Sequence, residues 1–468
     1  FKFNYRKGGF DLSGTLFGGK FRSGNNQQLG MITYLDKLWE QEIDARDGKN
    51  TESNVQGVLS LNYQFNEKHS MGVRYDMDKY FNTISDWRFK TNVYTDKELY
   101  ETNVSTMLGE YPSTKHSLNY YYNGQIGDWN IDFNADGLWN IKEETQHTRE
   151  VTNGDTEANV NTFNKNDGTL YAAKLVVSYP LWQGSLSFGG EYSHTDRSNI
   201  YINQEGILAD DDSRIKEGSM GAFIDYSRSF GKVDVQAGIR YENVNFDYYE
   251  QGKHIDEQSR MFNNVFPSLN MNFPIGKAQV QLSYSGGITR PSYDMLRSNT
   301  YYSNKYTYQT GNPFLKPVIN QDINLSASYK WINFSFIYNH IKDDIIQISE
   351  PYSDTNPTIS LLNIINAKSY NNIISSVTLS PTISWWNPQF MAQVYKQWFH
   401  IDGKDGELTL SKPRMTLVWR NSFTLPAGFL FDIDGTYYTK GHIQNMYMGI
   451  NSLNVSMGLY KSFFKERL

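Results

Sequence analysis

The chain has 468 residues, with 44 Lys+Arg against 50 Asp+Glu and a formal net charge of -6. This balance provides no basic field, so we expect no nucleic-acid partner. The absence of Cys excludes disulfides and thiolate metal sites. Hydrophobic residues make up only 39% of the chain and mean hydropathy is -0.60. Because no run approaches the roughly eighteen apolar residues of a membrane-spanning helix, a helical membrane protein is excluded.

Aromatic residues are nevertheless abundant, at 15% of the chain, with 34 Tyr, 27 Phe and 10 Trp. A disordered polar chain does not carry so many rings in a regular pattern. A transmembrane β-barrel reconciles low hydropathy with many rings. Only every second residue of its strands faces lipid, and aromatic girdles lie at the two membrane interfaces.

Apolar and polar residues alternate from one end of the chain to the other. The pattern is already present at residues 1–6 and recurs, for example, at 233–240, 279–289, 323–330 and 453–460. In one such segment Val280, Leu282 and Tyr284 share a face, and Gln279, Gln281 and Ser283 share the opposite face. We count about nineteen such strands, each near or above the roughly ten residues that a tilted membrane strand requires. The first face is predicted to contact lipid and the second the lumen.

Short and long connections alternate along the chain. Small or polar residues that tolerate tight hairpins mark the short turns, at Gly8-Gly9, Asn66-Glu67, Gly127-Asp128, Gln183-Gly184, Gly231-Lys232, Ile275-Gly276 and Ala427-Gly428. The long connections, rich in Asn, Asp, Ser, Thr and Tyr, cover residues 23–50, 84–113, 144–167, 203–216, 291–317 and 349–358. In bacterial outer-membrane barrels the short turns face the periplasm and the long loops face outside. The alternation therefore predicts both the location and the orientation of the chain.

A soluble all-β sandwich or propeller is the alternative fold, since its strands also alternate. Three features count against it. The predicted strands often exceed ten residues, above the usual five or six. The polar face is full of Gln, Asn, Asp and Arg, and the lengths of the connections alternate strictly.

Residues 265–330 carry the most specific stretch of the sequence, with ITRPSYDML at 288–296 followed by GNPFLKP at 311–317. This stretch resembles the TonB-dependent receptors of the Bacteroidetes type, especially the outer membrane β-barrel family. Arg290-Pro291 is predicted to end a strand at the outer rim, because Pro cannot donate to a ladder. Gly311, Asn312, Pro313 and Pro317 belong to the returning half of the loop, where Gly and Pro favour turns. We interpret the motif as structural.

The resemblance implies a 22-stranded barrel with a plug domain in its lumen. About nineteen strands are visible, and the plug domain is not in this chain. No TonB-contacting segment precedes Phe1, and KSFFKERL at 461–468 is typical of the start of a periplasmic turn. We therefore expect residues 1–468 to be one outer-membrane β-barrel domain that is incomplete at both ends.

No catalytic or metal site is predicted. The eight His are dispersed, and no nucleophile elbow, P-loop or H-E-x-x-H motif occurs. We expect no cofactor and no enzyme activity. The acidic groups Asp210-Asp211-Asp212 and Asp402, Asp405 and Glu407 lack the ligand spacing of a calcium loop, so solvated acidic loops are the favoured interpretation.

The loop at 291–317 concentrates rings and amides. Tyr301, Tyr302, Tyr306, Tyr308 and Asn312 are candidate ligand-binding residues, because rings and amides can stack on and hydrogen-bond a sugar or a similarly polar ligand. The alternative, which the sequence favours, is that these Tyr pack within the loop or belong to the interface girdle.

The resemblance implies an outer-membrane receptor that binds a scarce nutrient at its extracellular loops and imports it by TonB-coupled transport. Its implied partners are outer-membrane lipids, the nutrient, the TonB complex through a segment absent here, and possible surface lipoprotein subunits. The alternative is a passive porin or a structural subunit of a larger outer-membrane assembly. The sequence does not identify the ligand.

Overall fold

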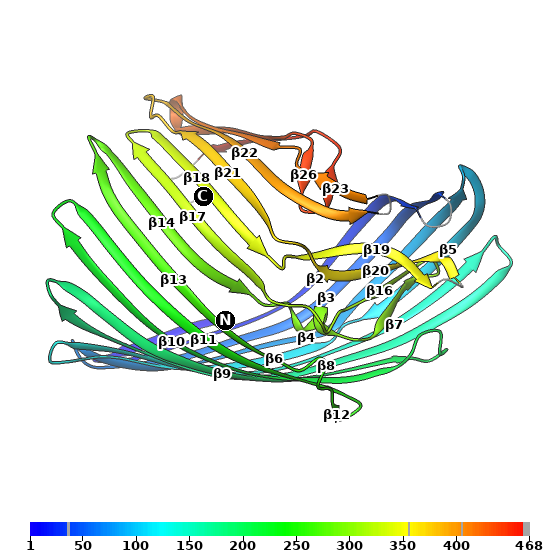
Figure 1. Ribbon diagram of the computed structural model, residues 1–468, viewed down its shortest axis with the longest axis horizontal. Helices are drawn as coiled ribbons and strands as arrows, with labels where there is room; N and C mark the ends of the chain where they lie inside the picture. Colours follow the sequence, from blue (N-terminus) through cyan, green and yellow to red (C-terminus); the bar gives the residue numbers. More distant parts are fainter. Residues whose placement is uncertain (35–37, 354–355, 404–405, 462–468) are drawn as a thin grey trace.

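The computed structural model describes residues 1–34, 38–353, 356–403 and 406–461. These residues form one large antiparallel sheet, a four-stranded sheet and a small hairpin. Figure 1 shows the large sheet curving around a central space, with the four-stranded sheet on its concave side. The helices of the described part are two 3-10 turns, η1 (Tyr293–Leu296) and η2 (Pro426–Gly428). No helix in that part is long and apolar enough to cross a membrane.

The large sheet contains 22 strand segments. In chain order they are β1 (Lys2–Lys7), β2 (Phe10–Tyr34), β3 (Leu38–Asn66), β4 (His69–Thr95), β5 (Glu98–Glu110), β6 (Ser113–Ile126), β7 (Trp129–Thr152), β8 (Thr156–Leu181), β9 (Gly184–Asn203), β10 (Asp211–Phe230), β11 (Val233–Glu250), β12 (Lys253–His254), β13 (Arg260–Ile275), β14 (Ala278–Thr289), β17 (Val318–Tyr329), β18 (Ile332–Lys342), β21 (Tyr370–Leu379), β22 (Trp386–Gly403), β23 (Gly406–Leu410), β24 (Arg414–Leu425), β25 (Phe429–Tyr438) and β28 (Ser452–Lys461). The four-stranded sheet consists of β15 (Thr300–Asn304), β16 (Thr307–Thr310), β19 (Ile345–Ser353) and β20 (Asn356–Asn366). The small hairpin consists of β26 (Gly441–Ile443) and β27 (Met446–Met448).

Three pairs of segments in the large sheet are interrupted single strands. β4 pairs antiparallel with both β5 and β6, β11 pairs with both β12 and β13, and β22 pairs with both β23 and β24. Counting each such pair as one strand gives nineteen wall strands among the described residues. The expected number of strands is therefore confirmed.

The register between strands separates an apolar face from a polar one. Leu282 on β14 lies opposite Met271 on β13 and Leu325 on β17. Gln281, on the other face of β14, lies opposite Asn272 and Ser326. Successive residues of a strand point to opposite faces of the sheet. Apolar side chains therefore line one face across these neighbouring strands, and polar side chains line the other.

Strand β11 shows which face is the inner one. Phe246 and Tyr248 are buried against the segment that follows β14, which folds onto the concave side (Figure 1). Ile239 and Tyr241 lie at odd positions of β11 and therefore point to the other face of the sheet, where they are 50% and 47% exposed. The exposed apolar face is therefore the outer, lipid-facing one, as the alternation predicts.

Several long connections are paired strands and not irregular loops. The sequence predicts connections at 84–113 and 144–167, but β4 continues to Thr95 before a two-residue turn, and β7 continues to Thr152. Asp96 and Lys97 both have positive φ, of 52° and 73°, which suits a tight two-residue hairpin. Polar composition alone does not separate a loop from a strand that extends above the membrane with water on both faces.

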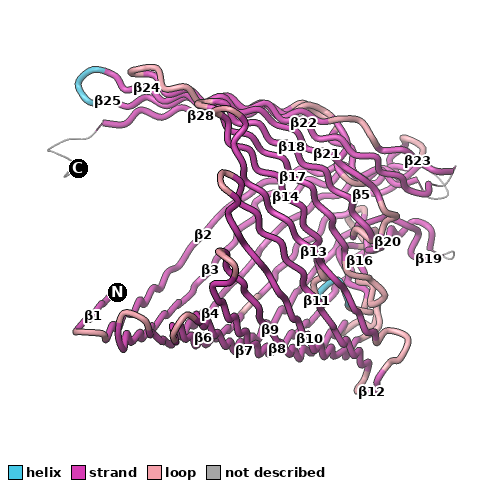
Figure 2. Tube along the Cα trace, turned by 60° about the vertical axis from the view of Figure 1, so that its left-hand side comes forward, coloured by secondary structure: helices cyan, strands magenta, loops and turns pink. Residues whose placement is uncertain are grey.

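The wall is a meander in which each strand pairs with its neighbours along the chain. Tight turns with positive φ occur at Gly8, Gly127, Gly231 and Gly276, at positions that the sequence predicts. Strands β1 and β28 are the edges of the sheet and are not paired with each other among the described residues. Figure 2 shows these two edges lying apart.

Candidate functional site

Two connections fold back onto the inner face of the wall at the end opposite the short turns (Figure 1). One joins β14 to β17 and contains the hairpin β15–β16, and the other joins β18 to β21 and contains β19–β20. Strand β16 pairs in parallel with β20, so the two connections form one sheet. We call this four-stranded sheet the mouth strap.

The sequence motif lies at the root of the mouth strap. β14 ends at Thr289, directly before Arg290-Pro291, and the guanidinium of Arg290 is paired with the buried carboxylate of Glu242 on the wall. At Gly311 a Cβ atom would lie 2.5 Å from the carbonyl oxygen of Arg297. This position therefore requires glycine for a close approach of two backbone segments.

Asn312 and Pro313 also take part in backbone contacts. The Asn312 side chain donates to the carbonyl of Ile364 at 2.9 Å and accepts from the amide of Phe314 at 2.9 Å. The guanidinium of Arg260 donates to the Pro313 carbonyl at 2.5 Å. The bond to Ile364 joins the two connections, and Pro317, also of the motif, directly precedes β17.

A buried apolar cluster fixes the root to the wall. Leu296 and Leu315 of the strap connection pack against Ile215, Phe246 and Tyr248 of β10 and β11. Leu315 is 1% exposed and Tyr248 is fully buried. Burying an aliphatic or aromatic side chain of this size contributes about 1.5–3 kcal/mol.

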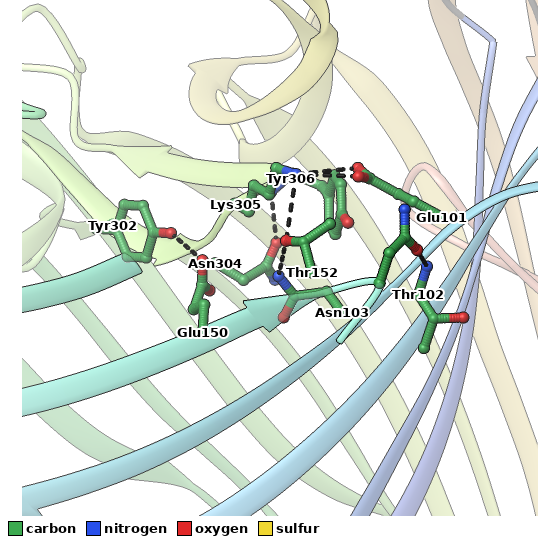
Figure 3. A network of polar contacts seen from close by, with 10 residues as sticks. Glu101, Thr102, Asn103, Glu150, Thr152, Tyr302, Asn304, Lys305 and Tyr306 are labelled. Carbon is green, nitrogen blue, oxygen red and sulfur yellow. Dashed lines mark hydrogen bonds and ion pairs between the residues drawn. The ribbon is translucent and has the colours of Figure 1, made fainter. Parts of the chain in front are cut away.

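The tip of the strap is held by charged and polar contacts (Figure 3). The Lys305 ammonium lies 3.0 Å from the carboxylate of Glu101 on β5 and 3.4 Å from the Thr152 hydroxyl on β7. The Tyr302 hydroxyl donates to Glu150 of β7 at 2.7 Å. Glu150 is only 2% exposed, so this hydrogen bond satisfies one oxygen of a carboxylate that solvent does not reach.

Three of the four candidate tyrosines are buried: Tyr302 is 9% exposed, Tyr306 6% and Tyr308 6%. Tyr302 and Tyr308 share an apolar cluster with Val160 of β8. Burial, followed by the nearby Glu150 carboxylate, raises the pKa of Tyr302 well above its ordinary value, so its hydroxyl remains a donor. These contacts favour the packing interpretation for the three rings, and ligand binding by them stays a prediction.

Tyr301 lies in a different environment from its neighbours. It is half-buried, its ring meets Tyr201 edge-on at 4.7 Å, and the Arg297 guanidinium lies over it at 3.8 Å from the ring centre. Burial raises the pKa of Tyr301 to about 12. Its ring is therefore sandwiched between protein groups at the level of β9.

Four of the acidic side chains considered for cation binding, those of Asp210, Asp211, Asp402 and Glu407, contact other protein groups. Asp210 accepts from the Asn203 amide at 2.8 Å, and Asp211 accepts from Ser213 at 2.9 Å and from Ser298 at 3.0 Å. Asp402 and Glu407 lie 2.9 Å and 3.9 Å from the ammonium of Lys368. Asp405 lies outside the described residues. Within the described ranges no group of three or more His, Asp or Glu could hold a metal ion.

The inner face near the short turns is hollowed and polar. A hollow of about 690 Å³ is lined by side chains that include Asn62, Tyr121, Asn123, Asn130 and Asp132. The Tyr121 hydroxyl donates to Asn62 at 3.0 Å. Hydroxyl, amide and carboxylate groups thus continue along the lumen from the strap towards the opposite end.

Sequence reasoning missed the residues that hold the strap tip. Glu101, Glu150 and Lys305 are ordinary charged residues in polar segments, and no motif surrounds them. Lys305 is 204 positions from Glu101 along the chain. Only the three-dimensional pairing of strands β5 and β7 with the strap tip identifies them.

Comparisons with known proteins place this geometry among outer-membrane proteins. The model of the outer membrane protein beta-barrel family matches residues 125–468. The outer membrane transporter YddB from Escherichia coli has a similar structure, with 13% identity, a TM-score of 0.54, and coverage of 92% of this chain and 64% of that chain. The copper transporter OprC is similar with 9% identity, a TM-score of 0.58, and coverage of 95% of this chain and 72% of that chain. A search of curated proteins found no match.

At such low identity the two solved structures show the fold alone, and this chain spans less than two thirds of the length of YddB. The family match is more specific, because it covers most of the chain and includes the motif at 288–317. The part of the predicted resemblance that names the outer membrane β-barrel family is confirmed. The chain belongs to the outer membrane protein beta-barrel family, and its curved sheet is the wall of a β-barrel in the bacterial outer membrane.

Proposed function

We propose that the protein is an outer-membrane receptor that binds a scarce nutrient at its extracellular mouth and imports it by TonB-coupled active transport. In this proposal residues 1–468 form one barrel domain, and the TonB complex acts through a segment outside this sequence. The short turns face the periplasm and the mouth strap faces outside, as in outer-membrane barrels generally.

The mouth strap is the observation that carries the proposal. An open diffusion pore needs only a polar wall, whereas this wall carries a sheet folded onto its inner face and anchored at both root and tip. Such an anchored element narrows the mouth and presents a fixed surface to an entering solute. Two structures with a similar fold, YddB and OprC, are transporters by their descriptions.

The candidate ligand surface in this proposal is the strap together with the polar inner wall. Tyr301, Tyr302, Tyr306, Tyr308 and Asn312 shape that surface, and the amide and carboxylate groups along the lumen suit a polar solute. A surface lipoprotein that covers the mouth is compatible with this arrangement and is part of the proposal only as a possible partner.

The alternative is a passive porin or a structural subunit of a larger outer-membrane assembly. Uptake measurements separate the two. Cells that produce the full protein and cells that lack it are given labelled ferric chelates, copper, oligosaccharides and peptides, with and without an uncoupler of the inner-membrane proton gradient. A receptor accumulates one class with saturation, and the uncoupler abolishes the accumulation. Uptake that is unsaturable and insensitive to the uncoupler would establish the porin instead.

A further inference from the structure

The outer face of strands β2 and β4 changes from apolar to cationic over a short distance. On β2 the outward residue Leu16 is 52% exposed, and Lys20 and Arg22 follow on the same face and are exposed. On β4 the outward residue Met77 is followed by Lys79, which is also exposed. These cations therefore lie at the margin of the lipid-facing belt, on the side away from the short turns, with the outward ring of Phe81 two positions beyond Lys79.

The register brings the cations of the two strands near each other. Lys20 lies opposite Ser53 of β3, and Lys79 lies opposite Val55, the next outward position of the same strand. Two strand spacings and a shift of two residues give a Cα separation of about 12 Å. Long flexible side chains at that separation can reach one headgroup from two sides.

These three cations have no acidic partner among the described residues, unlike several other cations of the outer face. Three outward cations on β7, β8 and β10 are instead paired with a carboxylate: Arg149 with Glu157 at 2.7 Å, Lys165 with Glu143 at 3.2 Å and Arg214 with Asp196 at 2.5 Å. Within the described part of the chain, no carboxylate lies within ion-pair distance of Lys20, Arg22 or Lys79. Lys20, Arg22 and Lys79 thus carry positive charge on neighbouring strands that no carboxylate of the described residues neutralises.

We propose that Lys20, Arg22 and Lys79 form a binding site for the phosphate groups of an anionic lipid in the outer leaflet. We call these three residues the cation strip. A lipid is favoured over a soluble partner because the strip begins where the apolar belt ends, which is the level of lipid headgroups. The spacing favours a headgroup with two separated phosphates. The inference rests on the proposed orientation of the barrel and is independent of transport.

The test measures lipid binding by native mass spectrometry on the full protein in a neutral detergent. The probes are lipid A with two phosphates and its monophosphorylated form. We expect the variant Lys20→Gln/Arg22→Gln/Lys79→Gln to bind the bisphosphorylated lipid about a hundredfold more weakly, at about fivefold per cation. The monophosphorylated lipid should bind the unmodified protein more weakly than the bisphosphorylated form.

The matched control removes the same charge from paired positions, in the variant Arg149→Gln/Lys165→Gln/Arg214→Gln. It should bind the lipid as the unmodified protein does. An equal loss in both triple variants would overturn the proposal, because charge alone would then explain binding. Displacement of the lipid by an equal concentration of inorganic phosphate would also overturn it, since the site would then recognise a free anion. The three single variants provide the same comparison if a triple variant folds poorly.

Discussion

Removing one hydroxyl at the strap tip should loosen the mouth strap without disturbing the wall. The Tyr302 hydroxyl donates to Glu150 at 2.7 Å, and the second carboxylate oxygen of Glu150 is buried without a hydrogen-bond partner in the described structure. Tyr302→Phe keeps the ring, which packs with Tyr308 and Val160. The substitution therefore isolates the hydrogen bond from the apolar contact.

The expected magnitude follows from the charge and burial of the acceptor. A hydrogen bond to a charged group contributes about 1.5–3 kcal/mol, and Glu150 is 2% exposed, so water does not replace the lost donor. A loss of about 2 kcal/mol corresponds to roughly a 30-fold increase in the population of the detached strap. The hydrogen-bonded wall opens independently, because local opening free energies differ among parts of a protein.

Hydrogen exchange followed by mass spectrometry measures this directly. Peptides covering 300–310 and 356–366 should exchange roughly 30-fold faster in Tyr302→Phe, while peptides from β13 and β14 should not change. Tyr192→Phe, on the outer face at 50% exposure, is the matched control and should change neither region. Unchanged exchange of the strap in Tyr302→Phe would refute the assignment of the hydrogen bond as an anchor. In a Glu150→Gln background, Tyr302→Phe should accelerate hydrogen exchange of the strap by a smaller factor, because the acceptor is no longer charged.

The other predictions concern the wall, its orientation and the root of the strap. Leu282→Arg should lower the free energy of barrel unfolding by about 2–4 kcal/mol if the residue lies near the bilayer midplane, whereas Gln281→Arg should be tolerated; equal tolerance would contradict the assignment of faces. In intact cells an impermeant thiol reagent should label Asp212→Cys and spare Asp128→Cys, and the reverse result would invert the topology. Gly311→Ala should destabilise the root by about 1–3 kcal/mol, because its Cβ would meet backbone; full hydrogen-exchange protection of residues 293–317 in this variant would show that the close approach is not needed.

The features that the sequence predicts are those set by local patterns. The alternation of apolar and polar residues at 279–289 predicts which side chains of β14 face lipid and which face the lumen. In the structure, residues of the same kind lie opposite them on the neighbouring strands β13 and β17. Turns at Gly127 and Gly231 follow from small residues between alternating segments, and both have positive φ. The strand ends before Pro291 because proline lacks the amide that a ladder needs. Each of these inferences depends on residues within about ten positions of one another.

The features that the sequence does not predict depend on distant pairing. Nothing near residues 356–366 indicates that β20 pairs in parallel with β16, about fifty positions earlier in the chain. The extension of β4 and β7 above the membrane has a polar composition that a loop would also have. Glu101 and Glu150 become strap anchors only because the wall brings β5 and β7 side by side.

Rings beside amides have the same composition whether they bind a ligand or pack within a protein, so burial must separate the two roles. Tyr302, Tyr306 and Tyr308 are buried against the wall, and removing them would first expose apolar surface and detach the strap. In the proposed receptor an entering solute instead meets the positions of the strap that remain exposed, which include Gln309 and Gln347. We infer that the tyrosines fix the shape of the mouth and that these exposed amides are better placed to contact what passes through it.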